Sequence, residues 1–132
     1  MSKALAIQMK SLLFFVIFCL YGCDSGTMWE HHPYEVHWID SNVTLAKRFD
    51  DQPHSVTIGR IPANVIAVGI NDSYVVAKQK DPGDDRVFYF YIDRVKDSGY
   101  ENLDEITQGP MSEKTFLDLK VKYGLPEFSK EF

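Results

Sequence analysis

Six short segments with the composition of β-strands follow one another between residues 34 and 93, and the short connections between them limit the folds open to the chain. The segments are rich in β-branched and aromatic residues, and turn-forming clusters such as Asp40-Ser41-Asn42 separate them. Connections of this length cannot hold a crossover helix, so successive strands should pair antiparallel. The sequence therefore predicts an α+β fold built on an antiparallel β-meander of about six strands with one C-terminal helix packed on the sheet. The predicted strands are residues 34–39, 43–48, 55–60, 65–70, 74–80 and 87–93.

The helix is indicated by the stretch GPMSEKTFLDLKVKYGLP. Ser112 has the side chain of a typical N-cap, and Gly124 followed by Leu125-Pro126 is a typical helix end. Apolar residues recur between these caps at intervals of three and four, which is the spacing of one helix face. We therefore expect this face to anchor the helix on the sheet. The residues of the predicted contact face are Phe116, Leu119 and Tyr123, with Leu117 and Val121 on its flank.

The segment VFYFYID carries large apolar area on both faces of one predicted strand. Because side chains alternate along a strand, Phe88, Phe90 and Ile92 point one way, whereas Tyr89 and Tyr91 point the other. One interpretation is a central strand of a curled sheet, with the tyrosine hydroxyls at the rim. The other is that Tyr89 and Tyr91 contact a protein partner, because tyrosine supplies a large contact area at interfaces.

The N-terminal part of the chain has the layout of a signal peptide. Lys3 and Lys10 provide a basic start, and the apolar stretch SLLFFVIFCL follows. Ten residues of helix rise only about 15 Å, about half the hydrocarbon thickness of a bilayer, so a permanent transmembrane span is not expected. The small residue Gly22 lies immediately before Cys23, as cleavage by a signal peptidase requires.

The residues Leu20-Tyr21-Gly22-Cys23 resemble the lipobox of bacterial lipoproteins, although Tyr21 is bulkier than the residue usual at its position. In that family the cysteine thiol is diacylglycerated and the chain is cut before it. The resemblance implies a signal peptide at residues 1–22, a lipid on Cys23 that binds the membrane, and a periplasm-facing location in a bacterial cell envelope. Asp24 resembles the inner-membrane retention signal of enteric bacteria, and the choice between inner and outer membrane stays open. An ordinary secretory signal or an uncleaved anchor is the alternative.

The rest of the chain is expected to form a short tether at residues 23–33 and a single globular domain at residues 34–132. Cys19 leaves with the signal peptide and Cys23 carries lipid, so no disulfide is expected. Two of the fourteen basic residues and none of the nineteen acidic residues precede Cys23, which leaves twelve against nineteen and a net charge of −7. Nucleic acid and anionic headgroups are therefore poor partners, whereas a basic protein is allowed.

No pattern in the sequence indicates catalysis. There is no G-x-S-x-G nucleophile elbow, P-loop or Rossmann glycine pattern, and neither cysteine is free to act as a nucleophile. The histidines, His31, His32, His37 and His54, lack the spacing of a metal site on one strand, and Pro33 interrupts the first three. The loop DPGDDR lacks the ligand order of a calcium loop. The sequence therefore predicts no enzyme, no cofactor and no metal.

Residues 63–126 resemble a second group, small bacterial lipoproteins of unassigned function, in the order of their strands and in the C-terminal helix that follows a Gly-Pro pair. Several lipoproteins of this size and location are immunity proteins, which bind and block a toxin delivered into the periplasm. The resemblance implies no catalytic residues.

These observations together predict a non-catalytic, membrane-anchored binding module, and specifically an immunity protein that neutralises a periplasmic toxin. The alternative is a lipoprotein of envelope assembly or maintenance, which binds a partner in its own cell. We expect the contact with the partner to centre on Tyr89 and Tyr91. Asp81, Asp84 and Asp85 should mainly speed the encounter with a basic partner, because their charge acts at long range.

Overall fold

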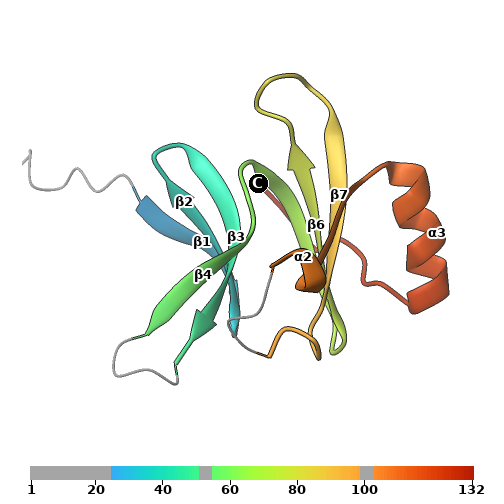
Figure 1. The fold of residues 1–132 in the computed structure, drawn as a ribbon. Helices are drawn as coiled ribbons and strands as arrows, with labels where there is room; N and C mark the ends of the chain where they lie inside the picture. The colour runs from blue at the N-terminus through green and yellow to red at the C-terminus, as the bar shows by residue number, and fades with distance from the viewer. Residues whose placement is uncertain (1–24, 51–54, 99–102) are drawn as a thin grey trace, which may run out of the picture.

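The computed structural model describes residues 25–50, 55–98 and 103–132 (Figure 1). The signal peptide, Cys23 and Asp24 lie outside these residues, so the interpretations placed on them stay predictions. Among the described residues, no helix is both long enough and apolar enough to cross a membrane. The elements in this part of the chain are β1 (Ser25–His31), β2 (Tyr34–Ile39), β3 (Asn42–Phe49), β4 (Val56–Ile61), β5 (Val65–Ile70), β6 (Tyr74–Lys80), β7 (Val87–Asp93), α2 (Leu103–Ile106), β8 (Thr107–Met111), α3 (Glu113–Tyr123) and β9 (Lys130–Glu131).

The strands form two antiparallel sheets rather than one. The N-terminal sheet has the strand order β1-β2-β3-β4, and the C-terminal sheet has the order β8-β7-β6-β5-β9. The predicted antiparallel, strand-rich fold with a C-terminal helix is confirmed, but the single meander of about six strands is less exact. The reason lies at Pro62, which follows β4 and has no N–H to continue a ladder, so the chain leaves one sheet there and enters the other at Val65.

Three strands are missing from the sequence prediction, and all three lie at sheet edges. These are β1, β8 and β9. An edge strand is hydrogen-bonded to a neighbouring strand on one side only. These three strands join their sheets through that backbone pairing, and their own sequences lack the β-rich composition that would predict a strand. The predicted tether at residues 23–33 is corrected accordingly, because Ser25–His31 pairs with β2 as β1, and Trp29 packs against the core.

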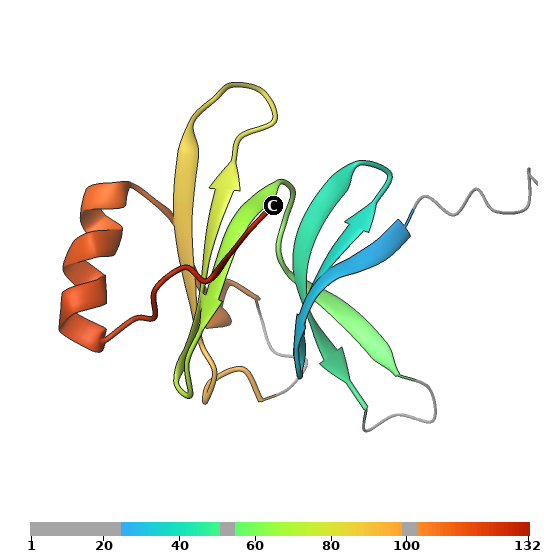
Figure 2. The same cartoon turned by 180° about the vertical axis from the view of Figure 1, so that it is seen from behind.

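The molecule has three layers, which Figures 1 and 2 show from opposite sides: the N-terminal sheet, the C-terminal sheet and α3. We call the face of the C-terminal sheet that meets the other sheet its inner face, and the face beneath α3 its outer face. The main core between the sheets consists of Tyr34, Val36, Leu45, Ile61, Val65, Val68, Val75, Ala77, Phe90, Ile92 and Ile106. A smaller core beneath α3 consists of Val76, Tyr89, Phe116 and Leu125.

Helix α3 is capped by the residues that the sequence indicates. The Oγ of Ser112 accepts a hydrogen bond from the backbone N–H of Thr115, with an N–O distance of 3.3 Å. Gly124 adopts a φ of 71°, a left-handed conformation that favours glycine, and its N–H donates to the Lys120 carbonyl at 2.9 Å. The predicted helix bounds are therefore confirmed.

The face of α3 that meets the sheet is narrower than the predicted one. Phe116 is fully buried, and Leu119 packs beside it, as expected. Tyr123 also contacts the sheet, through the rings of Tyr74 and Tyr91, but it is 42% exposed, and Leu117 and Val121 on the flank are exposed to solvent. The apolar stripe therefore anchors the helix through Phe116 and Leu119, with Tyr123 at its edge.

A buried ionic cluster joins the two sheets at one end of the main core. Asp97, in the turn after β7, is 1% exposed and accepts hydrogen bonds from the Tyr34 hydroxyl (2.8 Å), from Arg60 Nε (3.1 Å) and from Arg60 Nη2 (2.9 Å). Lys47 Nζ lies 3.7 Å from the Asp97 carboxylate and donates to its backbone carbonyl. A carboxylate this deeply buried requires such partners, and we call these four residues the Asp97 cluster.

Candidate binding site

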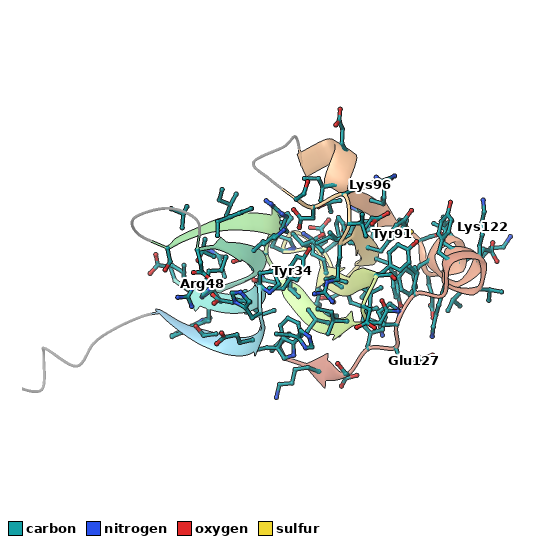
Figure 3. All side chains as sticks on the ribbon, turned by 90° about the horizontal axis from the view of Figure 1, so that it is seen from below. Tyr34, Arg48, Tyr91, Lys96, Lys122 and Glu127 are labelled. Atoms are coloured by element: carbon teal, nitrogen blue, oxygen red, sulfur yellow. The ribbon has the colours of Figure 1, made fainter. Side chains whose placement is uncertain are left out.

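A pocket lies at the outer face of the C-terminal sheet, where residues of α2 and of the end of α3 meet the sheet. Its volume is about 230 Å³, and we call it the tyrosine pocket. In Figure 3, Tyr91 lies between β7 and α3, and Lys96 lies near α2. Because the lining comes from β6, β7, α2, β8 and α3, only the folded chain forms the pocket. The lining residues are Tyr74, Tyr91, Asp93, Lys96, Glu105, Ile106, Gln108 and Tyr123.

The three tyrosine rings contact one another along one side of the pocket. The centroids of Tyr74 and Tyr91 are 5.9 Å apart with an interplanar angle of 78°, and Tyr123 lies 6.1 Å from Tyr91 and 6.3 Å from Tyr74. These separations are in the range of favourable aromatic pairs. Burial raises the pKa of Tyr91, and the neighbouring Tyr123, Tyr74 and Asp93 raise it further, so its hydroxyl stays protonated and can donate a hydrogen bond.

Asn71 holds together the two elements that carry Tyr74 and Tyr123. Its Oδ1 accepts hydrogen bonds from the backbone N–H groups of Ser73 (2.9 Å) and Tyr74 (2.7 Å), which shapes the turn between β5 and β6. Its Nδ2 donates to the Gly124 carbonyl at the end of α3, at 3.1 Å. The start of β6 and the end of α3 are therefore held by one side chain, which makes Asn71 a positioning residue for the pocket.

The charged groups of the pocket are two carboxylates and one ammonium, from Asp93, Glu105 and Lys96. Asp93 Oδ1 accepts a hydrogen bond from the backbone N–H of Val95 at 3.1 Å, which orients that carboxylate at the end of β7. The pocket thus carries an excess of negative charge beside three aromatic rings. This combination attracts cations.

The structure separates Tyr89 and Tyr91, which the sequence treats as a pair. Tyr91 lines the pocket, whereas Tyr89 is 8% exposed, with its ring centroid 5.0 Å from that of Phe116 and 6.2 Å from that of Phe128. Burial raises the pKa of Tyr89, and the charge of Glu113 raises it further. Tyr89 therefore offers little surface to a partner in this structure, and its main contacts are with α3 and the C-terminal segment.

The acidic loop at residues 81–85 lies apart from the tyrosine pocket. It connects β6 to β7 at the end of the sheet opposite α2 (Figure 1). Arg86 forms ion pairs with Asp81 (3.3 Å) and Asp84 (2.7 Å), and Lys80 forms one with Asp85 (3.3 Å). The loop borders an open hollow of about 540 Å³. Neighbouring cations therefore offset much of the negative charge that the sequence predicts to attract a partner.

Two of the described histidines, His37 and His32, each lie near one carboxylate. His37 Nε2 lies 2.6 Å from Glu35 Oε2, without the geometry of a hydrogen bond, and His32 Nε2 lies 3.6 Å from Asp50 Oδ2. His54 lies outside the described residues. Within the described residues, no three His, Cys, Asp or Glu side chains gather where they could hold a metal ion.

Comparison with protein-family models, with curated proteins and with solved structures finds no match to this chain. The geometry of the chain itself is therefore the basis for its proposed function.

Several pocket residues are absent from the sequence prediction. Tyr74 directly follows the Asn71-Asp72-Ser73 turn, and Tyr123 directly precedes the helix-ending Gly124. Aromatic residues at the ends of two predicted elements were the available signal, but nothing local shows that the two ends meet. Glu105 had no local signal, because α2 is a single turn.

Proposed function

We propose that the protein is a membrane-anchored, non-catalytic binding module that receives a basic side chain of a protein partner in its tyrosine pocket. The observation that carries this proposal is the lining, in which three tyrosines lie beside Asp93 and Glu105. Aromatic faces attract ammonium and guanidinium groups, and carboxylates pair with the same cations. Arginine fits best, because its planar group stacks on a ring while it donates to a carboxylate.

The size of the pocket favours a side chain over a free ligand. Its volume of about 230 Å³ is below the roughly 300–1,000 Å³ of small-molecule sites. Arginine and tyrosine are among the residues that contribute most energy at protein interfaces, where they fill pockets near the centre of the contact. A protein that places one arginine in the tyrosine pocket therefore agrees with both the volume and the chemistry.

The partner in this proposal is a toxin that acts in the periplasm, so the protein is an immunity protein. Three features support it: the lipobox resemblance at Cys23, the net charge of −7 that follows removal of the signal peptide, and the position of the pocket. Strand β1, which follows Cys23, begins at the side of the molecule opposite α3 (Figure 1). A domain anchored through Cys23 would hold the end of α3 away from the membrane, where a soluble partner can reach it.

A toxin challenge tests this function. Cells that lack the gene are challenged with sibling cells that deliver the toxin encoded beside it, and are complemented with wild type or variants. We expect the deletion strain to die, wild type to protect it, and Tyr91→Ala/Tyr123→Ala to lose protection at equal abundance in the membrane. The matched control is Leu117→Ala/Val121→Ala, which removes exposed apolar side chains of α3 that do not line the pocket.

Two outcomes would contradict separate parts of the proposal. Survival of the uncomplemented deletion strain would remove the immunity function and leave envelope assembly or maintenance as the alternative. Full protection by Tyr91→Ala/Tyr123→Ala would remove the tyrosine pocket as the contact.

The anchor is tested separately. Cys23→Ala should abolish incorporation of labelled fatty acid and move the protein out of the membrane fraction, because two or more acyl chains contribute about 0.8 kcal/mol for each buried methylene. Unchanged labelling and fractionation would contradict the lipobox interpretation.

Binding of the partner should weaken as salt is added, because charge complementarity between exposed groups is screened.

A further inference from the structure

The hairpin between β2 and β3 ends in exposed apolar side chains. Trp38 is 37% exposed and Ile39 is 52% exposed at the end of β2. Asp40 (φ 50°) and Ser41 (φ 66°) then reverse the chain in left-handed conformations, which is the geometry of a tight two-residue hairpin turn. We call residues 38–43 the hairpin tip.

The register of β1 places the hairpin tip beside the point where the chain leaves the predicted anchor. Ser25 pairs with Ile39 and Gly26 pairs with Trp38. Cys23 precedes Ser25 by two residues, and two extended residues span at most about 7 Å. A lipid on Cys23 therefore brings the hairpin tip within side-chain reach of the bilayer surface. The tether of residues 23–33 that the sequence suggested would not have done so.

We propose that the hairpin tip lies in the headgroup region of the bilayer that holds Cys23, and that this contact orients the domain. The inference rests on the lipid anchor of the proposed function. Consecutive residues point to opposite faces of a strand, so a hairpin that meets the membrane end-on places Trp38 on one side and Ile39 on the other. Tryptophan is enriched at this depth because its ring is apolar and its N–H still finds a partner.

Asp40 sets the depth and the lipid chemistry of the contact. Its carboxylate lies at the turn between the strands, and a charged group at the centre of a bilayer is costly, so the tip stays among the headgroups. A negative charge at the tip favours zwitterionic over anionic headgroups. With two attachment points, the lipid and the hairpin tip, the domain has a defined tilt, and the pocket at the end of α3 faces away from the membrane.

The test uses the acylated full chain, purified from membranes and reconstituted in vesicles of phosphatidylethanolamine with a minor fraction of phosphatidylglycerol, whose acyl chains are brominated. The chain contains two tryptophans, Trp29 and Trp38. Trp29→Phe leaves Trp38 as the only tryptophan, and Trp38→Phe leaves Trp29, which packs against the core, as the matched control, with tryptophan emission excited selectively over that of the tyrosines. We expect bromine to quench Trp38 several-fold more than Trp29.

A second pair of variants tests the contact without removing the reporter. In the Trp29→Phe background, Ile39→Glu should return Trp38 quenching to the level of the Trp29 control, because it adds charge to the tip. Val56→Glu, at an exposed position at the opposite end of the same sheet, should leave quenching unchanged.

The outcomes separate the inference from the anchor on which it rests. Protein that sediments with the vesicles while Trp38 is quenched no more than Trp29 would overturn the membrane contact and leave the anchor intact; a free hairpin tip or one covered by a protein would give this result. Unchanged quenching in Ile39→Glu would overturn it as well. Acylated wild type that fails to sediment with vesicles would overturn both.

Discussion

The two faces of the C-terminal sheet are covered in different ways. On the inner face, Val75, Ala77 and Ile92 are fully buried against the N-terminal sheet. On the outer face, Tyr89 is nearly buried beneath α3, but Tyr91 keeps part of its surface in the tyrosine pocket. Strand β7 contributes to both faces, so one alternating sequence lines a closed core on one side and an open pocket on the other.

The difference follows from the extent of the covering element. Four strands cover the inner face, whereas the outer face is covered by one helix of eleven residues and the segment that follows it; the helix is about 16 Å long. Near Tyr74 and Tyr91 only the last residue of α3, Tyr123, meets the sheet, so this end of the outer face is covered only in part. Tyrosine suits this position, because its ring packs on the sheet while its hydroxyl remains hydrated. Incomplete coverage therefore creates the candidate site.

The largest effect on stability is expected at the Asp97 cluster, which closes one end of the inner face. Asp97→Ala should lower the free energy of unfolding by about 3–5 kcal/mol, because it leaves the charge of Arg60 buried without this partner. Urea denaturation measures the change. Asp50→Ala is the control, since Asp50 pairs with Arg48 at an exposed site and should cost less than about 1 kcal/mol. Equal losses in the two variants would contradict the role given to the cluster.

The next largest effect is expected beneath α3. Phe116→Ala should cost about 3 kcal/mol, near the lower end for a buried phenylalanine, because the helix can move toward the sheet and reduce the cavity. Leu117→Ala, on the exposed side of the same helix, should change stability by less than about 0.5 kcal/mol. If urea denaturation gave the two variants equal stability, α3 would not be anchored through Phe116.

A smaller effect distinguishes the tyrosine hydroxyls of the two faces. Tyr34→Phe removes a donor to the buried Asp97 and should cost about 1–3 kcal/mol. Tyr91→Phe removes a hydroxyl from an open pocket that water can fill, and should cost less than about 0.5 kcal/mol. The pair is measured under identical conditions by urea denaturation. A cost for Tyr91→Phe as large as that for Tyr34→Phe would show that the pocket is closed rather than open.

The last prediction concerns stability at alkaline pH, and the expected change in the free energy of unfolding is absent at neutral pH. Burial raises the pKa of Tyr34 far above its usual range, with further contributions from its hydrogen bond to Asp97 and the charge of Asp97. The unfolded chain releases this proton near pH 10 and the folded chain does not. The stability that Tyr34 contributes is therefore fully present below about pH 10 and is lost as the pH rises above it. Burial lowers the pKa of Lys47, so this group adds stability as the pH rises toward about 10.5, which opposes the effect of Tyr34.

The measurement is the free energy of unfolding at about pH 8 and about pH 11. Wild type should lose stability across this interval, and Tyr34→Phe should lose less of it. An identical loss in both proteins would assign the alkaline transition to groups other than Tyr34.

Local signals in the sequence determined the strands β2 to β7 and the helix α3. Alternation and β-rich composition define a strand within a few residues, and turn residues such as Asn71 separate neighbouring strands. Ser112 and Gly124 define the ends of α3, because a cap is a contact between residues three or four positions apart. Phe116 and Leu119 were correctly placed on the contact face of α3 for the same reason.

Only the tertiary structure decided how these elements divide into two sheets and where the pocket lies. Tyr34 and Asp97 are 63 residues apart in the chain, and Asn71 and Gly124 are 53 apart, yet each pair is joined by a hydrogen bond. Periodicity and capping report on neighbours within a few residues, so they carry no information about such contacts. The position of Tyr91 in a pocket and of Tyr89 beneath a helix follows from how α3, α2 and the C-terminal segment pack on the sheet, which is a property of the packed chain.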